Sequence, residues 1–173
     1  MNLRAINNAK GFSMIEVLVT LVILMFGLLG LAGLQGRALT SQLESYQRSQ
    51  ALALIKDMED RINANRTHAA DYVVNPVAAA AAICSGTRAQ IDLCEWKKAL
   101  DGSAEGTSSG AMIGATGCIY ETSSVAPKRY LIAIAWQGLS NTVAPTVDCG
   151  QDTFGNDALR RVITIPVTIG KLT

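Results

Sequence analysis

The chain has 173 residues, which suits one globular domain with an additional segment, and 49% of its residues are apolar. It carries 15 lysines and arginines against 14 acidic residues, for a formal net charge of +1, and it contains 1 histidine. A charge this close to zero argues against non-specific nucleic-acid binding by the whole chain, and one histidine leaves little material for a Ser-His-Asp or Cys-His catalytic constellation.

The N-terminus combines a short polar leader with a long apolar run. The leader, Met1 to Lys10, has only Arg4 and Lys10 as charges, and the apolar run continues from Gly11 to Leu34. Such a run is close to the ~20 residues that a helix needs to cross a bilayer. Positive charge favours the cytoplasmic side, so we expect a cytoplasmic N-terminus and a C-terminal part across the membrane. No A-x-A-like site follows the run, so cleavage by the usual signal peptidase is not expected.

Glu16 is the only charged residue between Lys10 and Arg37. An ionisable group inside such a segment costs about 2.5–3.5 kcal/mol on insertion scales near the bilayer centre, so it usually has a function and a partner. One interpretation pairs Glu16 with an opposite charge, such as a free amine on Phe12. The other places it about 6 Å along the helix axis from Phe12, where it simply reaches the headgroup region.

The residues Gly11-Phe12-Ser13-Met14-Ile15-Glu16, between a basic leader and an unbroken apolar run, resemble the class III leader of type IV prepilins and pseudopilins. The resemblance implies that a prepilin peptidase cuts between Gly11 and Phe12 and methylates the new amine of Phe12. The mature chain would then begin at Phe12. It also implies that Glu16 meets the amine of a neighbouring subunit and so sets the register of a growing filament.

Small residues recur within the apolar run, at Gly27, Gly30, Gly33 and Gly36. On a helix they form a stripe where another helix can approach closely. Glycine also weakens a helix, and part of this region can lose helical structure in pili of the family that the chain resembles. Whether the stripe packs or unwinds in a filament is left open.

From Arg37 the pattern becomes amphipathic, with apolar residues at helical spacing and charges between them. We expect one helix from Phe12 to about Asn63, ending within Ile62 to Arg66 at two asparagines. Residues 12–36 would be its membrane or filament-core half, and residues 37–66 its amphipathic half. The apolar positions of the second half are Leu39, Leu43, Tyr46, Leu54 or Ile55, Met58 and Ile62.

Residues 67–173 are expected to form a globular head. Ala78 to Ala82 and Ala89 to Leu100 are predicted to be short helices. The segment Gly102 to Gly117 is rich in Gly, Ser and Thr and is predicted to be a loop or the entrance of a hairpin. The phosphate-binding pattern G-x-x-x-x-G-K-[ST] is absent from the sequence, so no nucleotide cofactor is predicted.

Three strands are predicted: Gly117 to Thr122, Arg129 to Gln137, and Arg161 to Ile169. The second is apolar on both faces, as a central strand is. The third has one apolar face, formed by Ile163, Ile165, Val167 and Ile169, and contains Pro166, which cannot donate a ladder hydrogen bond; it is predicted to be an edge or bulged strand. The predicted class is α+β, with the amphipathic helix packed against a small antiparallel sheet, and the resemblance implies the type IV pilin fold.

The four cysteines, Cys84, Cys94, Cys118 and Cys149, all fall in the head, where the compartment is expected to be oxidising. Two disulfides are therefore expected. Four cysteines allow three pairings, and the sequence cannot choose among them, but Cys84 with Cys94 and Cys118 with Cys149 close the shortest loops and are our preference. No C-x-x-C occurs, and His68 is interpreted as a surface residue, so no metal site is predicted.

The acidic residues of the head sit among polar residues and are interpreted as solvated groups, so no enzyme is predicted. An alternative is a membrane-anchored hydrolase, in which two of these carboxylates from separate loops would meet in a cleft. These residues include Asp92, Glu95, Asp101 and Asp148.

Three basic pairs raise the alternative of DNA binding through phosphate contacts. Two of them flank predicted strands, where charges commonly mark element ends, so we interpret them as structural. The pairs are Lys97-Lys98, Lys128-Arg129 and Arg160-Arg161.

A looser resemblance covers most of the chain. It is similar to the PilV-type minor pilins, the pilus modification proteins, and it implies a subunit without enzymatic activity that waits in the inner membrane with a periplasmic head. Such a subunit joins a minor-pilin complex that primes assembly and ends near the pilus tip. The residues that carry this resemblance are Asp92-Leu93, Trp96, Leu100, Gly117, Trp136 and Arg160-Arg161.

The partners implied are other minor pilins, the major pilin, a tip adhesin, the inner-membrane assembly platform and a prepilin peptidase. Two alternatives remain. One is a pseudopilin of a type II secretion system, and the other is a bitopic membrane protein with a periplasmic ligand-binding or hydrolytic domain.

Overall fold

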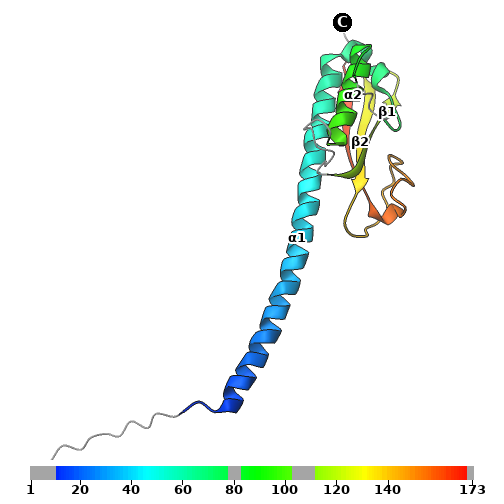
Figure 1. Cartoon of the computed structure of the whole chain (residues 1–173). Helices are drawn as coiled ribbons and strands as arrows, with labels where there is room; N and C mark the ends of the chain where they lie inside the picture. Colours follow the sequence, from blue (N-terminus) through cyan, green and yellow to red (C-terminus); the bar gives the residue numbers. More distant parts are fainter. Residues whose placement is uncertain (1–10, 78–82, 103–111, 171–173) are drawn as a thin grey trace, which may run out of the picture. The chain divides into compact units, whose positions relative to one another are not determined.

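A computed structural model describes residues 11–77, 83–102 and 112–170 of the chain. The predicted leader and the predicted helix Ala78 to Ala82 lie outside these residues. The chain divides into two compact units, Met1–Ser41 and Gln42–Thr173. The elements, in chain order, are α1 (Met14–Ala64), η1 (Arg66–Tyr72), α2 (Arg88–Leu100), β1 (Ile113–Ser123), β2 (Lys128–Gln137), η3 (Asp157–Leu159) and β3 (Arg160–Ile169) (Figure 1).

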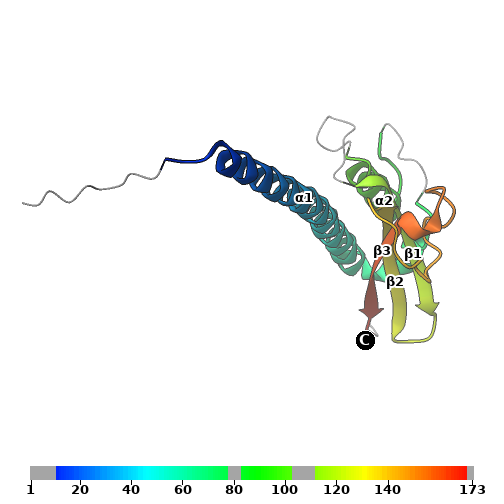
Figure 2. The ribbon, with the colours of Figure 1, turned by 90° about the horizontal axis from the view of Figure 1, so that it is seen from below.

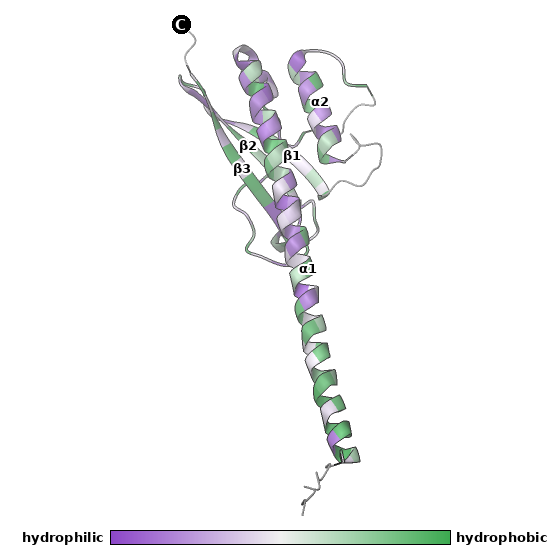
Figure 3. Ribbon diagram, turned by 90° about the vertical axis from the view of Figure 1, so that its left-hand side faces the viewer, coloured by the Kyte–Doolittle hydropathy of each residue, from purple (hydrophilic) through white to green (hydrophobic). Residues whose placement is uncertain are grey.

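The surface of α1 changes character along its 51 residues. Every residue from Gly11 to Leu43 is exposed. Most residues of this stretch are coloured as hydrophobic in Figure 3. Further along, the buried positions are three or four residues apart and therefore share one face of the helix. The helix ends at Ala64, inside the segment where its end was predicted. The buried residues are Gln47, Ala51, Ile55, Met58 and Ile62.

The three strands form one antiparallel sheet in the order β1-β2-β3 (Figure 2). The position of β2 confirms the prediction of a central strand that is apolar on both faces. β3 is an edge strand, as Pro166 predicted, and Pro166 lies opposite Leu131 of β2. The observed strands extend each predicted strand by one residue or more at its N-terminal end.

Alternation along β2 directs its side chains into two separate cores. Ile132 and Ile134 belong to the larger core, which also holds Ile55 of α1 and Trp96 of α2. Ala133 and Ala135, on the opposite face, belong to a small core with Cys118 and Cys149. The predicted packing of the amphipathic helix against one face of the sheet is therefore confirmed.

α2 begins at Arg88, one residue before the predicted start, because Thr87 caps it. The Thr87 hydroxyl accepts from the Gln90 amide at 3.3 Å, and the Gln90 side chain accepts from the Thr87 amide at 2.9 Å. This reciprocal pair satisfies two backbone donors that a helix start leaves free. The helix is joined to α1 by Trp96, whose indole N–H donates to the Leu54 carbonyl at 2.9 Å.

The prediction of a loop through Gly117 is wrong for its last residues, because β1 already begins at Ile113. Gly114 has a φ of 61°, and the register shifts between Ile113 and Thr116. Glycine adopts this left-handed conformation without steric cost, so it forms a bulge within the strand and does not end it.

The segment that follows η1 extends the outer edge of β1, which the sequence analysis did not predict. Val74 and Ile119 exchange two backbone hydrogen bonds, of 2.9 and 2.7 Å, and the Val77 amide donates to the Gly117 carbonyl at 2.8 Å. These bonds cover part of the edge of β1 that β2 leaves unpaired.

Candidate functional site

The predicted processing site lies at the start of the first unit. Gly11 and Phe12 precede the helix, and the Phe12 side chain is 83% exposed. The Ser13 carbonyl accepts from the amides of Glu16 and Val17, at 3.0 and 3.3 Å, and so begins α1. Glu16 consequently lies in the first helical turn, where a negative charge interacts favourably with the helix dipole.

The surface behind Glu16 is apolar on all sides. Its side chains include Leu21, Ile23 and Phe26, which are 52%, 65% and 72% exposed. An 18-residue window of α1 reaches a mean hydropathy of 2.7, so the helix is long and apolar enough to cross a membrane. A helix that is hydrophobic all round needs lipid or other helices around it. Among the described residues, none forms a hydrogen bond or ion pair with the Glu16 carboxylate.

The glycine stripe lies on this part of α1, which is helical throughout. A Cβ built on Gly27, Gly30, Gly33 or Gly36 meets nothing within 4 Å. The small residues therefore serve no packing purpose among the described residues of the chain. They leave one side of the helix open to close approach by another helix.

The buried Arg160 side chain holds the loop between β2 and β3 in place. Arg160 is 2% exposed and pairs with Asp157 through two contacts of 2.6 and 2.8 Å. Its guanidinium also donates to the carbonyls of Cys149 at 2.9 Å, Pro145 at 3.0 Å and Val147. A planar donor fork of this kind satisfies several loop carbonyls at once.

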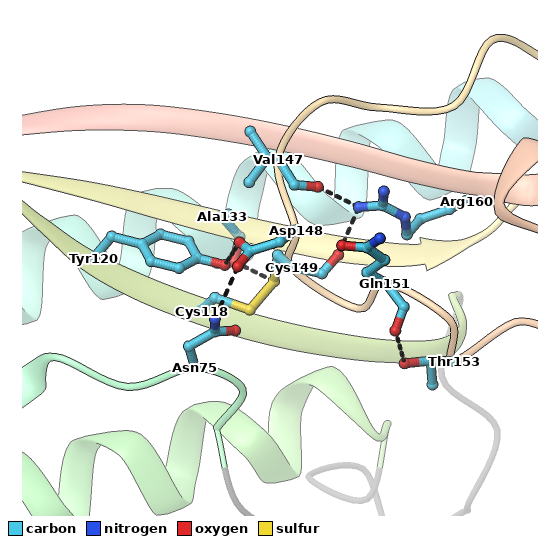
Figure 4. The surroundings of a disulfide bond; sticks show 10 residues. All are labelled: Asn75, Cys118, Tyr120, Ala133, Val147, Asp148, Cys149, Gln151, Thr153 and Arg160. Carbon is cyan, nitrogen blue, oxygen red and sulfur yellow. Dashed lines mark hydrogen bonds between the residues drawn. A yellow bond between two sulfur atoms is a disulfide. The ribbon is translucent and has the colours of Figure 1, made fainter.

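The same loop is fastened to β1 by a disulfide and a phenol (Figure 4). Cys118 of β1 is bonded to Cys149 of the loop. Beside it, the Tyr120 hydroxyl donates to Asp148 at 2.6 Å, and the Asn75 side chain donates to Asp148 at 3.3 Å. Burial and the neighbouring Asp148 carboxylate raise the pKa of Tyr120.

The second disulfide joins Cys84 to Cys94 of α2, so the structure contains the preferred pairing of Cys84 with Cys94 and Cys118 with Cys149. This bond attaches the end of the segment before α2 to the helix itself. The two bonds therefore attach the segment before α2 and the loop between β2 and β3 to regular elements.

Glu44 attaches the loop to α1 near the start of the second unit. Its carboxylate accepts from the Ser140 hydroxyl at 2.9 Å, the Arg161 guanidinium at 3.1 Å and the Leu139 amide at 3.3 Å. Burial raises the pKa of Glu44, but the bonds to Ser140, Arg161 and Leu139 outweigh it, and the net shift is downward. Glu44 is therefore held in its charged form as a clamp on the loop.

Asp92 corrects the interpretation of the acidic residues as solvated groups, because its side chain is only 1% exposed. It accepts from the Tyr72 hydroxyl at 2.6 Å and pairs with Arg61 at 2.9 Å and Arg88 at 3.0 Å. Burial and this carboxylate raise the pKa of Tyr72 to about 12. A signal existed in the sequence: Asp92 shares its helical spacing with the buried residues Ala89, Trp96 and Leu100.

Most residues of the basic pairs form contacts within the head or lie at the start of a strand. Arg160 and Arg161 open β3 and hold the loop, and Lys97 pairs with Asp101. Lys128 and Arg129 open β2, where both are exposed. The prediction that two of the pairs flank strands is confirmed.

His68 is exposed, and its ring contacts the Thr67 hydroxyl at 3.0 Å. Among the described residues, no three His, Cys, Asp or Glu side chains form a cluster that could hold a metal ion. Two surfaces are described above: the exposed apolar first part of α1, and the surface of the head.

Two protein families match parts of the chain. The family described as the prokaryotic N-terminal methylation motif matches residues 6–32. The family described as Type IV pilin Tt1218 matches residues 33–109, which contain the remainder of α1, η1 and α2. No curated protein and no solved structure gives a significant match.

Proposed function

We propose that this chain, a type IV pilin with the prepilin N-terminal methylation motif, is a minor pilin that contributes to the initiation of pilus assembly. After its leader is removed, it would join other minor pilins in a complex that primes the filament and remains near the tip. Three residues of the looser resemblance have structural roles in the head, because Trp96 packs on Gly117 and Arg160 holds the loop before β3.

One observation carries this proposal: Glu16 is the single charge on an otherwise apolar helical surface, four positions after the exposed Phe12. A charge that is unpaired in a dry environment is strongly unfavourable, so a filament core favours an opposite charge beside Glu16. The methylated amine of Phe12 on a neighbouring subunit would supply it, with glycines that allow helices to approach closely.

The proposal assigns a role to each part of the chain. Residues 1–11 are the leader, residues 12–36 the membrane and filament-core part, residues 37–66 the amphipathic part, and residues 67–173 the head. The protein first resides in the inner membrane with its N-terminus cytoplasmic and its head periplasmic, and then in the pilus. Its partners are a prepilin peptidase, the inner-membrane assembly platform, other minor pilins, the major pilin and a tip adhesin.

A second candidate shares the same N-terminal motif, namely a pseudopilin of a type II secretion system. It would use the same apolar helix in a short periplasmic pseudopilus. Surface exposure of the head separates the two candidates, because only a pilus subunit reaches the cell exterior. Labelling of head lysines other than Lys128 on intact cells by an impermeant amine reagent is therefore expected for a pilin, and protection is expected for a pseudopilin.

Mass spectrometry of the N-terminus of the purified protein tests the proposal. We expect a chain that begins at N-methylated Phe12, and an uncut leader in a Gly11→Val variant, because the larger side chain blocks cleavage after residue 11. Wild-type protein that retains Met1 to Gly11 would contradict the proposal and favour a bitopic membrane protein.

A further inference from the structure

The head contains a cavity of about 230 Å³ that the proposed function does not use. It lies between η1, the start of β2 and the end of β3. Arg66 and Thr67 line it from η1, Lys128 and Tyr130 line it from β2, and Ile169 closes it from β3. It belongs entirely to the second unit and is separate from the apolar part of α1.

The cavity combines positive charge with apolar walls. Arg66 and Lys128 are both exposed, and neither side chain forms an ion pair or hydrogen bond with a described residue. Glu121, opposite Tyr130 in the β1–β2 register, is an acidic residue close by, but it does not line the cavity. The charged residues that line the cavity are therefore both positive, and Glu121 adds a negative charge beside Tyr130.

Tyr130 adds a polar group without a partner. The residue is 1% exposed, and its hydroxyl oxygen is buried with no hydrogen-bond partner among the described residues. Buried polar groups are nearly always paired, so the unpaired hydroxyl of a residue that lines the cavity requires an explanation. A ligand that accepts a hydrogen bond would provide one.

We propose that this cavity receives one carboxylate, the side chain of an aspartate or glutamate on a partner protein subunit. The Arg66 guanidinium can bind both carboxylate oxygens, and the Lys128 ammonium supplies a second positive charge. Both side chains are long and exposed, so they can turn over the entering group, while the Tyr130 hydroxyl donates from the base. The aliphatic stem of the entering side chain packs on the apolar walls.

Cavity size favours a protein side chain over a small-molecule ligand. Sites for small molecules usually measure about 300–1,000 Å³, and this cavity is smaller. One acidic side chain fits such a volume, and the rest of the binding surface would come from the surrounding head. The inference does not depend on whether the partner is a pilin, so its failure would leave the proposed function intact.

The test uses the ¹⁵N-labelled full chain in detergent micelles, titrated with acetyl-Ala-Glu-Ala-amide and, as a matched probe, acetyl-Ala-Gln-Ala-amide. We expect the acidic peptide to shift the amide resonances of Thr67, Lys128 and Tyr130, and the neutral peptide to leave them unchanged. The shifts should weaken as salt is added, because exposed charges are screened. Equal effects of both peptides, or no effect of either, would overturn the proposal.

Variants assign the binding to the named groups. Arg66→Gln with Lys128→Gln is expected to weaken the acidic peptide about tenfold or more, since charge-assisted hydrogen bonds are lost. Arg129→Gln is the matched control, because Arg129 is the next exposed cation of β2 and does not line the cavity. Lys128→Arg keeps the charge and should retain binding. An equal loss in the Arg129→Gln variant would show general charge attraction and overturn the assignment.

Two further measurements test the role of the Tyr130 hydroxyl and the preference for a carboxylate over phosphate. Tyr130→Phe is expected to weaken the acidic peptide severalfold without loss of folding, and unchanged affinity would overturn the role of its hydroxyl. Inorganic phosphate is expected to compete only weakly, because it lacks an aliphatic stem. Phosphate that binds more tightly than the acidic peptide would make this a general anion site and overturn the choice of a protein carboxylate.

Discussion

The two parts of α1 differ in where their apolar side chains find partners. Up to Leu43 every residue is exposed, whereas Ile55, Met58 and Ile62 further along the same helix are fully buried against the sheet. The head thus contains its own core, two disulfides and several internal ion pairs, while the first part depends on surroundings that the chain does not supply. Mutations should therefore separate assembly from stability according to the part of the chain in which they fall.

The largest expected effect is on assembly, from Glu16→Ala. Membrane insertion and the unfolding temperature of the head should be unchanged, but recovery of the protein in sheared filaments should fall to background. The reason is that breaking a buried charge pair costs about 3–5 kcal/mol. Immunoblots of membrane and sheared-pilus fractions measure both quantities.

Asp60→Ala provides the control, because Asp60 is an exposed acidic residue on the head part of the same helix. Recovery of the Asp60→Ala variant in sheared filaments should match that of the wild type. Normal recovery of Glu16→Ala in filaments would contradict the pairing.

The next effect concerns stability and the head alone. Replacing both Cys118 and Cys149 by alanine opens a loop with a sequence separation of 31 residues and should cost about 3–4 kcal/mol. Replacing Cys84 and Cys94, which are separated by 10 residues, should cost about 1 kcal/mol less. Thermal unfolding of the full chain in detergent, followed by near-ultraviolet circular dichroism, measures the difference, and the reverse order would refute it.

A pair of glycine substitutions tests the comparison directly. A Cβ on Gly117 would lie 2.2 Å from the Trp96 ring, so Gly117→Ala should destabilise the head by about 1–3 kcal/mol. Gly33→Ala meets nothing within 4 Å and should leave the unfolding temperature of the head unchanged. The same thermal measurement decides, and equal effects at the two positions would argue against separate responses of the two parts.

The smallest effect is a pH dependence of the head. The unfolded chain loses the Tyr72 proton near pH 10.0, whereas the folded chain keeps it to about pH 12. Between these values the unfolded state binds fewer protons, so stability should fall as pH rises through this window. Unfolding temperatures measured from pH 9 to 12 should show this loss of stability. The loss should be smaller for Tyr72→Phe. Tyr46→Phe, which changes an exposed tyrosine, is the control and should behave as the wild type.

Much of the architecture followed from pattern, because long periodic segments carry a strong signal. The helix end near Ala64 was predicted from two asparagines, the central position of β2 from its apolar faces, and the edge position of β3 from Pro166. The start of β1 was missed because glycine usually signals a turn, and only the bulge at Gly114 turns it into a strand residue.

The candidate site also has features that the sequence predicted and features that it did not. The motif around Gly11, Phe12 and Glu16 is local, so it was identified without any structure and agrees with the family match to residues 6–32. The Glu44 clamp on Arg161 joins residues 117 positions apart, and no local pattern could predict it. The burial of Asp92 was predictable from its helical spacing, but its partners Arg61 and Tyr72 were not.

The sequence by itself determined the apolar helix, its single charge and the order of elements, because these depend on residues close together in the chain. Tertiary structure alone decided which polar side chains are buried and how the loop before β3 is held. It also decided that the Tyr130 hydroxyl, near Arg66 and Lys128, has no hydrogen-bond partner among the described residues. The physical reason is that burial and hydrogen bonding depend on neighbours brought together by folding. Those neighbours come from segments that no spacing rule connects.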